Sequence, residues 1–218
     1  MTSLAHHTRQ IFEQVSYLQC IKNYVLVGGT ALSLQIANRL SEDLDFMQWM
    51  PSKSKKREVD WVVIEKELKT IGEIQSFEMF GFEHVQFIVK GVKLSFYISD
   101  KSSPVTNPIQ YKNNLVLADL MSIAAMKMEV ILRRSNFRDY YDIYSLLKHG
   151  IDIKMAVELA LKYSNHRLST KNILALLADG SRFKADGSFA QLNPVYDVSV
   201  SDIEFYINSC IKNAFRSD

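Results

Sequence analysis

The fold is decided by two short stretches, Val27-Gly28-Gly29-Thr30-Ala31-Leu32 and Arg39-Leu40-Ser41-Glu42-Asp43-Leu44-Asp45-Phe46. The first ends a hydrophobic run in two glycines and a threonine, which predicts a strand that turns directly into a helix. In the second, two aspartates are separated by one residue, so on a β-strand both point to the same face. We expect Asp43 and Asp45 to lie side by side there, about 6–7 Å apart along the strand.

Two carboxylates on one strand face suit a divalent cation with oxygen ligands, Mg²⁺ or Mn²⁺. An isolated pair of this kind is more often a solvated strand edge or a turn, but the glycines upstream favour metal binding. Gly28 and Gly29 would let a backbone approach a phosphate closely, and a helix that begins at Thr30 offers free N–H groups to an anion. They could also form a tight turn, and they are not a Walker loop, because no Gly-Lys-Ser/Thr follows.

Three side chains near this pair allow more than one interpretation. Thr30 is expected to cap the helix, to contact a phosphate, or to do both, and we favour the phosphate. Arg39 and Ser41 are expected to hold the loop before the metal strand, and the guanidinium of Arg39 could also neutralise phosphate. Metal carboxylates beside a phosphate site indicate transfer chemistry on a nucleotide.

A second motif occupies Lys127-Met128-Glu129-Val130-Ile131-Leu132-Arg133-Arg134-Ser135-Asn136-Phe137-Arg138-Asp139-Tyr140-Tyr141-Asp142. On a continuous helix, Lys127, Arg134 and Arg138 would fall within about 40° of one another. The stripe could line a cleft and bind triphosphate, or it could be a solvated basic face. Ser135-Asn136 could break the helix and weaken this geometry.

Together, the two motifs resemble those of the AbiEii/AbiGii toxin nucleotidyltransferases, in the DNA polymerase β-like nucleotidyltransferase superfamily. The resemblance covers roughly residues 20–150. It implies transfer of a nucleoside monophosphate from an NTP to a hydroxyl acceptor, such as tRNA or another RNA, by the toxin of a toxin–antitoxin or phage-defence pair. A cognate antitoxin protein would then be a partner.

The resemblance also implies roles for individual residues. The catalytic set is Asp43, Asp45 and Lys127, with both aspartates binding the metal. The expected nucleotide-binding and phosphate-binding residues are Gly28, Gly29, Thr30, Arg39, Ser41, Arg134, Arg138, Asp139 and Asp142. Within that set, Asp142 is expected to orient Arg138, or the two form an ordinary i,i+4 surface pair.

One position departs from the superfamily pattern, which usually has a third carboxylate on a later strand. In Val92-Lys93-Leu94-Ser95-Phe96-Tyr97, Ser95 stands where that acid is expected. Another acid (Glu78, Glu83 or Asp100) could fill the role, the site could work with one metal, or it could be impaired. The alternative function is therefore a catalytically impaired module that binds nucleotide, RNA or a protein partner.

The composition is that of an ordinary globular protein, with 47% hydrophobic and 23% charged residues among 218. The net charge of +2 is too small to indicate nucleic-acid binding by itself. No apolar run is long enough for a membrane span, no signal core is present, and Cys20 and Cys210 lack CxxC spacing. We therefore expect a cytoplasmic protein without a membrane partner.

The patterns predict an α+β fold, in which a small mixed β-sheet nucleotidyltransferase domain is followed by a helical C-terminal region. The predicted boundary gives residues 1–114 to the α/β core and 115–218 to the helical region, with residues 99–114 as a linker. Within the core, strands are expected at 24–27, 43–48, 74–79, 84–89 and 92–98, with hairpin turns at Phe80-Gly81 and Lys90-Gly91 between the last three. The basic run at 53–57 is expected to be a solvated loop or an RNA contact, and Tyr140, Tyr141 and Tyr144 to pack in a helix or stack on a base.

Overall fold

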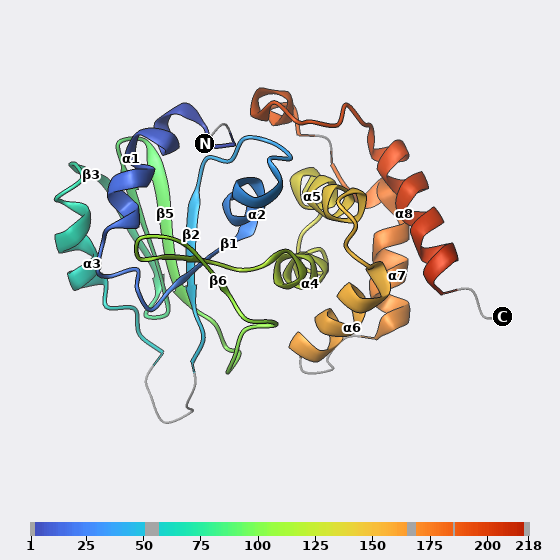
Figure 1. Cartoon of the computed structure of the whole chain (residues 1–218), viewed down its shortest axis with the longest axis horizontal. Coiled ribbons are helices and arrows are strands. Elements are labelled where there is room, and N and C mark those ends of the chain that lie inside the picture. The colour runs from blue at the N-terminus through green and yellow to red at the C-terminus, as the bar shows by residue number, and fades with distance from the viewer. Residues whose placement is uncertain (1–2, 51–56, 165–168, 185, 216–218) are drawn as a thin grey trace. The chain divides into compact units, whose positions relative to one another are not determined.

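The computed structural model describes residues 3–50, 57–164, 169–184 and 186–215. It separates into two compact units, Met1–Asp119 and Leu120–Asp218 (Figure 1). The first unit is the α/β part and the second is helical, so the α+β class expected from the sequence is confirmed. The first unit runs through Asp119 and includes residues 115–119, which the sequence patterns assigned to the helical region.

Within the described residues, the first unit contains a seven-stranded sheet with the order β3-β4-β5-β2-β1-β7-β6. Its strands are β1 Val25–Val27, β2 Leu44–Gln48, β3 Ile74–Gly81, β4 His84–Val89, β5 Val92–Ile98, β6 Ile109–Lys112 and β7 Leu115–Leu117. The pairs β2–β5 and β1–β7 are parallel, and the other neighbours are antiparallel. The sheet is therefore mixed, as expected.

The consecutive strands β3, β4 and β5 form two hairpins. Lys90 and Gly91 join β4 to β5 with φ angles of 49° and 76°, the positive values that a two-residue hairpin turn requires. The other turn lies at Phe82-Glu83, because β3 continues through Gly81, so its predicted position at Phe80-Gly81 is wrong. The strand β5 is buried along most of its length because it lies between β4 and β2.

The predicted linker at 99–114 is wrong for its last residues, because β6 and β7 form a hairpin that joins the sheet through β1. Two features hid this hairpin in the sequence. The strand β6 is an edge strand with three exposed residues and one partly exposed residue, so it lacks an apolar alternation. The strand β7 has three residues and leads after a short gap into a helix, so its apolar residues merge with the helical pattern.

The helices of the first unit are α1 His6–Ser16, α2 Gly28–Ile36 and α3 Trp61–Leu68. In Figure 1, α1 and α3 lie to one side of β5 and β2, and α2 lies on the other side. The core of this unit contains stacked and edge-on aromatic rings, such as Phe46 and Phe96, whose centroids are 5.0 Å apart. This packing fixes β5 against β2, the strand on which the first motif ends.

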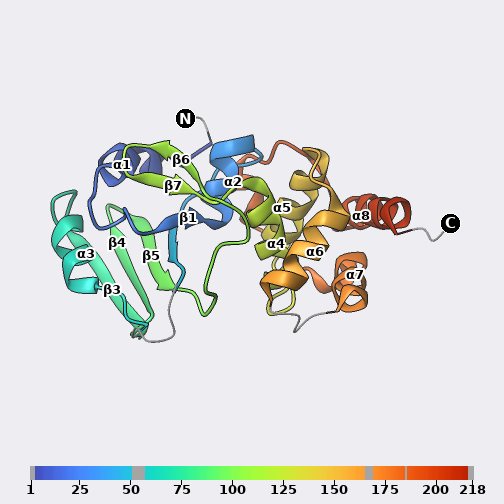
Figure 2. The same cartoon turned by 60° about the horizontal axis from the view of Figure 1, so that its bottom comes forward.

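The second unit consists of helices, seen in a second orientation in Figure 2. They are α4 Leu120–Val130, α5 Phe137–Lys148, α6 Ile153–Tyr163, α7 Thr170–Ala178, the short 3-10 helices Gly180–Arg182 and Phe189–Leu192, and α8 Val200–Ala214. Side chains cap four of the α-helices, and Ser199 and Asp202 form a reciprocal capping box at α8. No helix in the described ranges is both long and apolar enough to cross a membrane.

Candidate active site

The first motif places Asp45 against the start of α2. The antiparallel register of β1 and β2 pairs Val27 with Asp45, and α2 begins at the next residue, Gly28, with a φ of 72°. A Cβ atom at Gly28 would lie 3.2 Å from Oδ2 of Asp45. The carboxylate therefore lies close to the positive end of the helix dipole, where negative charge is favoured.

The glycine that follows makes room for an arginine of this chain. A Cβ atom at Gly29 would lie 2.5 Å from Nη2 of Arg39. Arg39 is only 6% exposed, and its Nη1 donates a hydrogen bond to the carbonyl oxygen of Leu40 at 3.0 Å. The close approach to Gly29 is thus made by a buried guanidinium, while phosphate contact at this glycine stays a prediction.

We expect Gly29→Ala to lower the free energy of unfolding by about 1–3 kcal/mol, because a buried guanidinium has little room to move away from the new methyl group. Urea titration followed by circular dichroism would measure this. Gly187→Ala is the matched control, because a Cβ atom there would meet no atom within 4 Å. Equal unfolding midpoints for the two variants would contradict the close packing of Arg39.

Thr30 and Ser41 join the start of α2 to the loop before Asp43. Both residues are buried, and their hydroxyl groups are hydrogen bonded at 2.7 Å. Thr30 also donates to the carbonyl oxygen of Asp43. The helix cap expected at Thr30 is wrong, because α2 begins at Gly28 and Val27 is its N-cap residue. The hydroxyl groups instead hold the loop that presents the two aspartates.

Asp43 and Asp45 face two residues of β5. The parallel register pairs Asp45 with Ser95, and the ammonium of Lys93 forms an ion pair with Oδ2 of Asp43 at 2.6 Å. The strand β2 begins at Leu44, so Asp43 lies just before the strand rather than on it. The register places Ser95 directly beside Asp45. Ser95 stands at the position where the family resemblance implies an acid.

The alternative acids lie elsewhere in the sheet. Glu78 shares the row of Ser95 and Gln86, but β3 is three strands away from β2, about 14 Å at ordinary strand spacing. Glu83 accepts a hydrogen bond from Ile98 N at 2.9 Å through its carbonyl, and Asp100 follows the same end of β5. That end is about 10 Å from Ser95 along the strand. None of these three acids is paired with Asp45 in the register of the sheet.

The two aspartates suit one hard cation. No group of three or more His, Cys, Asp or Glu side chains that could hold a metal occurs among the described residues. Mg²⁺ in nucleotide enzymes is commonly held by one or two carboxylates, with the remaining ligands coming from water and substrate phosphates. Asp43 and Asp45 are the residues that could hold such an ion, and metal binding at this pair stays a prediction.

In the second unit, the basic motif is not one continuous helix. The helix α4 ends at Val130 and α5 begins at Phe137, with Asn136 as its N-cap residue. Asn136 Oδ1 accepts a hydrogen bond from the backbone N–H of Arg138 at 3.1 Å. The expected stripe is therefore wrong beyond Val130, because the polar Ser135-Asn136 pair starts a new helix.

Lys127 lies in a buried network of ion pairs. Its ammonium is 2.6 Å from Oδ1 of Asp139 and 2.7 Å from Oδ2 of Asp142. Arg134 binds Asp139 through two of its nitrogens, at 2.7 and 3.0 Å. Burial by itself raises the pKa of the Asp139 carboxyl, but Lys127 and Arg134 outweigh it and hold that pKa below its usual value. The interpretation of Lys127 as part of a solvated face is wrong.

Arg138 pairs with an acid that the sequence motif does not contain. Its Nε is 2.7 Å from Oδ2 of Asp186, and its Nη2 donates to the hydroxyl oxygen of Ser188 at 3.0 Å. Asp142 forms an ion pair with the ammonium of Lys127 inside the unit, and the role expected for it in orienting Arg138 stays a prediction. Asp186 is distant in sequence and lies outside both motifs, so no sequence signal indicated it.

The pKa of Asp186 is about 2, because the Ser188 hydroxyl donates a hydrogen bond to its carboxylate and Arg138 pairs with it. A lowered carboxyl pKa stabilises the folded state above the unfolded value of 3.8, and this contribution is lost as the pH falls toward 2. We expect Ser188→Ala to raise the pKa toward 3.8, measured by carboxyl-carbon NMR titration. Ser181→Ala, which removes the hydroxyl bonded to Asp179, should leave the Asp186 titration unchanged.

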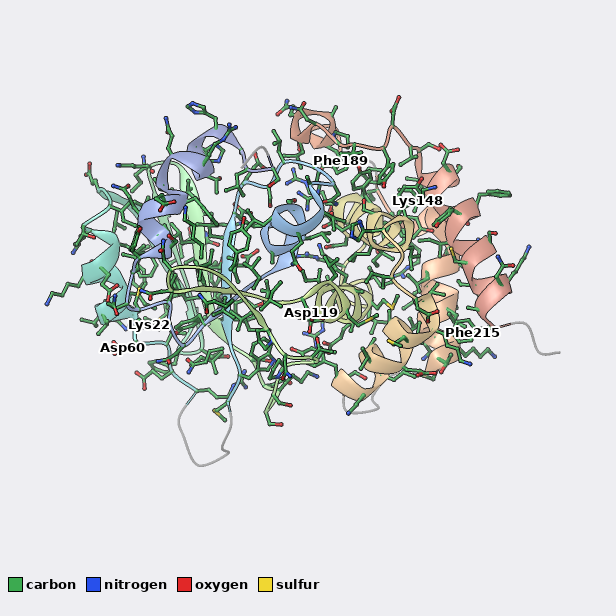
Figure 3. All side chains as sticks on the ribbon, in the orientation of Figure 1. Lys22, Asp60, Asp119, Lys148, Phe189 and Phe215 are labelled. Atoms are coloured by element: carbon green, nitrogen blue, oxygen red, sulfur yellow. The ribbon has the colours of Figure 1, made fainter. Side chains whose placement is uncertain are left out.

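The tyrosines of α5 belong to the core, so their packing interpretation is confirmed. Tyr140 and Tyr141 are fully buried, and Phe189, labelled in Figure 3, packs edge-on against Tyr141 at 4.8 Å. Most of the basic run at 53–57 lies outside the described residues. Its last member, Arg57, donates a hydrogen bond to the carbonyl oxygen of Ile98 at 3.0 Å.

Comparison with known proteins identifies the family to which this chain belongs. The model of the family described as "Nucleotidyl transferase AbiEii toxin, Type IV TA system" matches residues 12–198, which extends well beyond the two motifs. An uncharacterised protein of Aquifex aeolicus is 28% identical over 165 residues, covering 74% of this chain and 76% of that protein.

Two solved structures share the fold. JHP933 from Helicobacter pylori has a TM-score of 0.57 at 16% identity, covering 97% of this chain and 93% of that chain. The nucleotidyltransferase toxin MenT4 from Mycobacterium tuberculosis has a TM-score of 0.52 at 15% identity, covering 95% and 83%. The resemblance found in the two motifs is confirmed by the family match, and this chain belongs to the AbiEii family of nucleotidyltransferase toxins of type IV toxin–antitoxin systems.

Proposed function

We propose that this toxin transfers a nucleoside monophosphate from an NTP to a hydroxyl group of tRNA, with Mg²⁺ or Mn²⁺ as cofactor. The observation that supports this most is the placement of Asp45 against the first residue of α2, with Asp43 next to it. Two carboxylates beside a helix N-terminus provide a cation site and an anion site within the reach of one triphosphate.

In this reaction the acceptor oxygen forms a bond to the α-phosphorus of the NTP, and the bond from that phosphorus to the bridging β-oxygen breaks. Pyrophosphate leaves, and the hydroxyl proton passes to water. A bound Mg²⁺ would supply charge compensation for the triphosphate oxygens. Asp43 and Asp45 would hold this ion, and the first N–H groups of α2 would bind phosphate oxygens. Thr30, Ser41 and Arg39 would keep the loop and helix start in place.

The resemblance in the second motif assigns phosphate binding to basic residues of the second unit. Arg134 is the candidate for a phosphate contact, because its side chain is 59% exposed while Asp139 fixes its orientation. Lys127, Asp139 and Asp142 would act by positioning Arg134 rather than by binding the substrate directly. The toxin would work in the cytoplasm, where NTP and tRNA occur, in a phage-defence pair with an antitoxin.

The test is transfer of each α-labelled NTP to total tRNA in the presence of Mg²⁺. Label that enters RNA with the wild-type chain and not with Asp43→Ala/Asp45→Ala supports the proposal and identifies the nucleotide. If no NTP labels any RNA while nucleotide binding is measurable, the chain is not an active transferase.

That second result would favour a module that binds nucleotide, RNA or a protein partner without turnover. The observation in its favour is Ser95, which is paired with Asp45 in the sheet register and carries no charge. Ser95→Asp distinguishes the two functions. A gain of transfer in an otherwise inactive chain would identify the serine as the cause of inactivity.

A further inference from the structure

The strand β5, next to the two aspartates, places the ammonium of Lys93 beside Asp43. Continuing the register of β2 and β5 by one position from the Leu44–Leu94 pair places Lys93 opposite Asp43. The Lys93 ammonium is 2.6 Å from Oδ2 of Asp43, and the exposed fractions of the two side chains are 38% and 39%. An ion pair this exposed contributes little to stability. Its place beside Asp43, two residues before Asp45, points instead to a role in the charge of the site.

The charges near the aspartates limit how many cations the site can hold. On β5, the residues opposite the two aspartates are Lys93 and the uncharged Ser95. On β4, Gln86 follows in the row of Ser95, and His84 lies close enough to Asp45 to interact with it electrostatically. A second divalent ion there would have to share the two carboxylates with the first ion. It would also lie close to the Lys93 ammonium, which repels it.

We propose that Lys93 makes this a one-cation site, by supplying next to Asp43 the positive charge that a second divalent ion would otherwise supply. The inference rests on the proposed function for the first ion, which Asp43 and Asp45 hold. Lys93 then both limits the number of ions and lowers the negative charge that an incoming triphosphate meets. It is a positioning and charge-compensating residue that acts through Asp43.

The experiment is titration of the full chain with Mn²⁺ alone, with free Mn²⁺ counted by electron paramagnetic resonance. An ion is assigned to the site if the wild-type chain binds it and the Asp43→Ala/Asp45→Ala variant does not. We expect one such ion in the wild-type chain. Lys93→Met should bind that ion about tenfold more tightly, because the nearby positive charge is gone. Lys93→Glu should bind it about 100-fold more tightly and should gain a second ion.

Lys69 provides the matched control. It directly follows the last residue of α3 and forms a comparable exposed ion pair with Glu65 of that helix at 2.8 Å. Lys69→Met and Lys69→Glu should leave the Mn²⁺ count and affinity within twofold of wild type. Two aspartate-dependent ions in the wild-type chain, or an affinity that Lys93→Met does not change, would overturn the inference. One aspartate-dependent ion and the expected Lys93→Met response support the inference, even if the chain transfers no nucleotide. A failure of nucleotide transfer would contradict only the proposed function.

Discussion

Lys127→Met is expected to lower the free energy of unfolding by about 3–5 kcal/mol, the largest effect on stability of any single substitution considered. The change removes the cation that lies between two carboxylates with exposed fractions of 1% and 0%. Uncompensated buried charge is costly because the interior cannot solvate it as water does. Thermal unfolding should show a decrease in Tm of about 10 °C.

Arg133→Met is the control for this experiment. Arg133 forms an exposed i,i+4 ion pair with Glu129 in the same unit at 3.2 Å, so its loss should cost less than about 1 kcal/mol. Adding Asp142→Asn to Lys127→Met should recover part of the loss, because one buried negative charge is removed. A double variant that is less stable than Lys127→Met would show that repulsion between the carboxylates is not the cause.

The same network predicts a pH dependence with a definite sign. Asp139 has a lowered pKa in the folded wild-type chain, so its stabilising contribution is present above 3.8 and decreases as the pH falls. Without Lys127 that pKa is raised, and protonation relieves the repulsion. The stability difference between Lys127→Met and wild type should therefore become smaller from pH 7 to pH 4.

Asp45→Asn is expected to lower the rate of the proposed nucleotide transfer by at least about 10³-fold. The amide keeps the shape of the side chain next to Gly28 and removes its charge, so binding of the proposed cation is lost while the strand is retained. The measurement is the initial rate of label incorporation into tRNA, with Tm as a check on folding.

Glu78→Gln makes the same acid-to-amide change in the same row of the sheet, on β3 instead of β2. Because β3 is too distant to share a ligand with Asp45, this variant should keep its transfer rate within twofold of wild type. An Asp45→Asn chain that retains more than a tenth of the rate would show that this carboxylate does not bind the essential cation.

The sequence was most informative where the local pattern determines the structure. The alternation of β4 and the Lys90-Gly91 turn predicted a hairpin without reference to the rest of the chain. The family was also recognisable, because both motifs are contiguous in sequence. The hairpin of β6 and β7 was missed because an exposed edge strand carries no apolar period.

The candidate site was predicted less completely, because its contacts join distant residues. The spacing of the first motif predicted that Asp43 and Asp45 belong together. It could not show that Lys93 pairs with Asp43 or that Arg39 occupies the space over Gly29. In the second motif, spacing on an ideal helix suggested Asp142 as a partner of Arg138, but it could not show that tertiary packing brings Asp186 to the same guanidinium.

The strand order also determines when the candidate site can assemble during synthesis of the chain. Asp45 lies on β2, whose parallel neighbour β5 contains Ser95, and β1 pairs in parallel with β7 through Leu26 and Leu117. A ribosome must therefore translate past the codon for Leu117 before this sheet can close. Pairings between such distant residues also form slowly. A nascent or prematurely terminated chain that ends before β5 would carry both aspartates but would lack Ser95 and Lys93, the residues that lie beside them in the folded sheet.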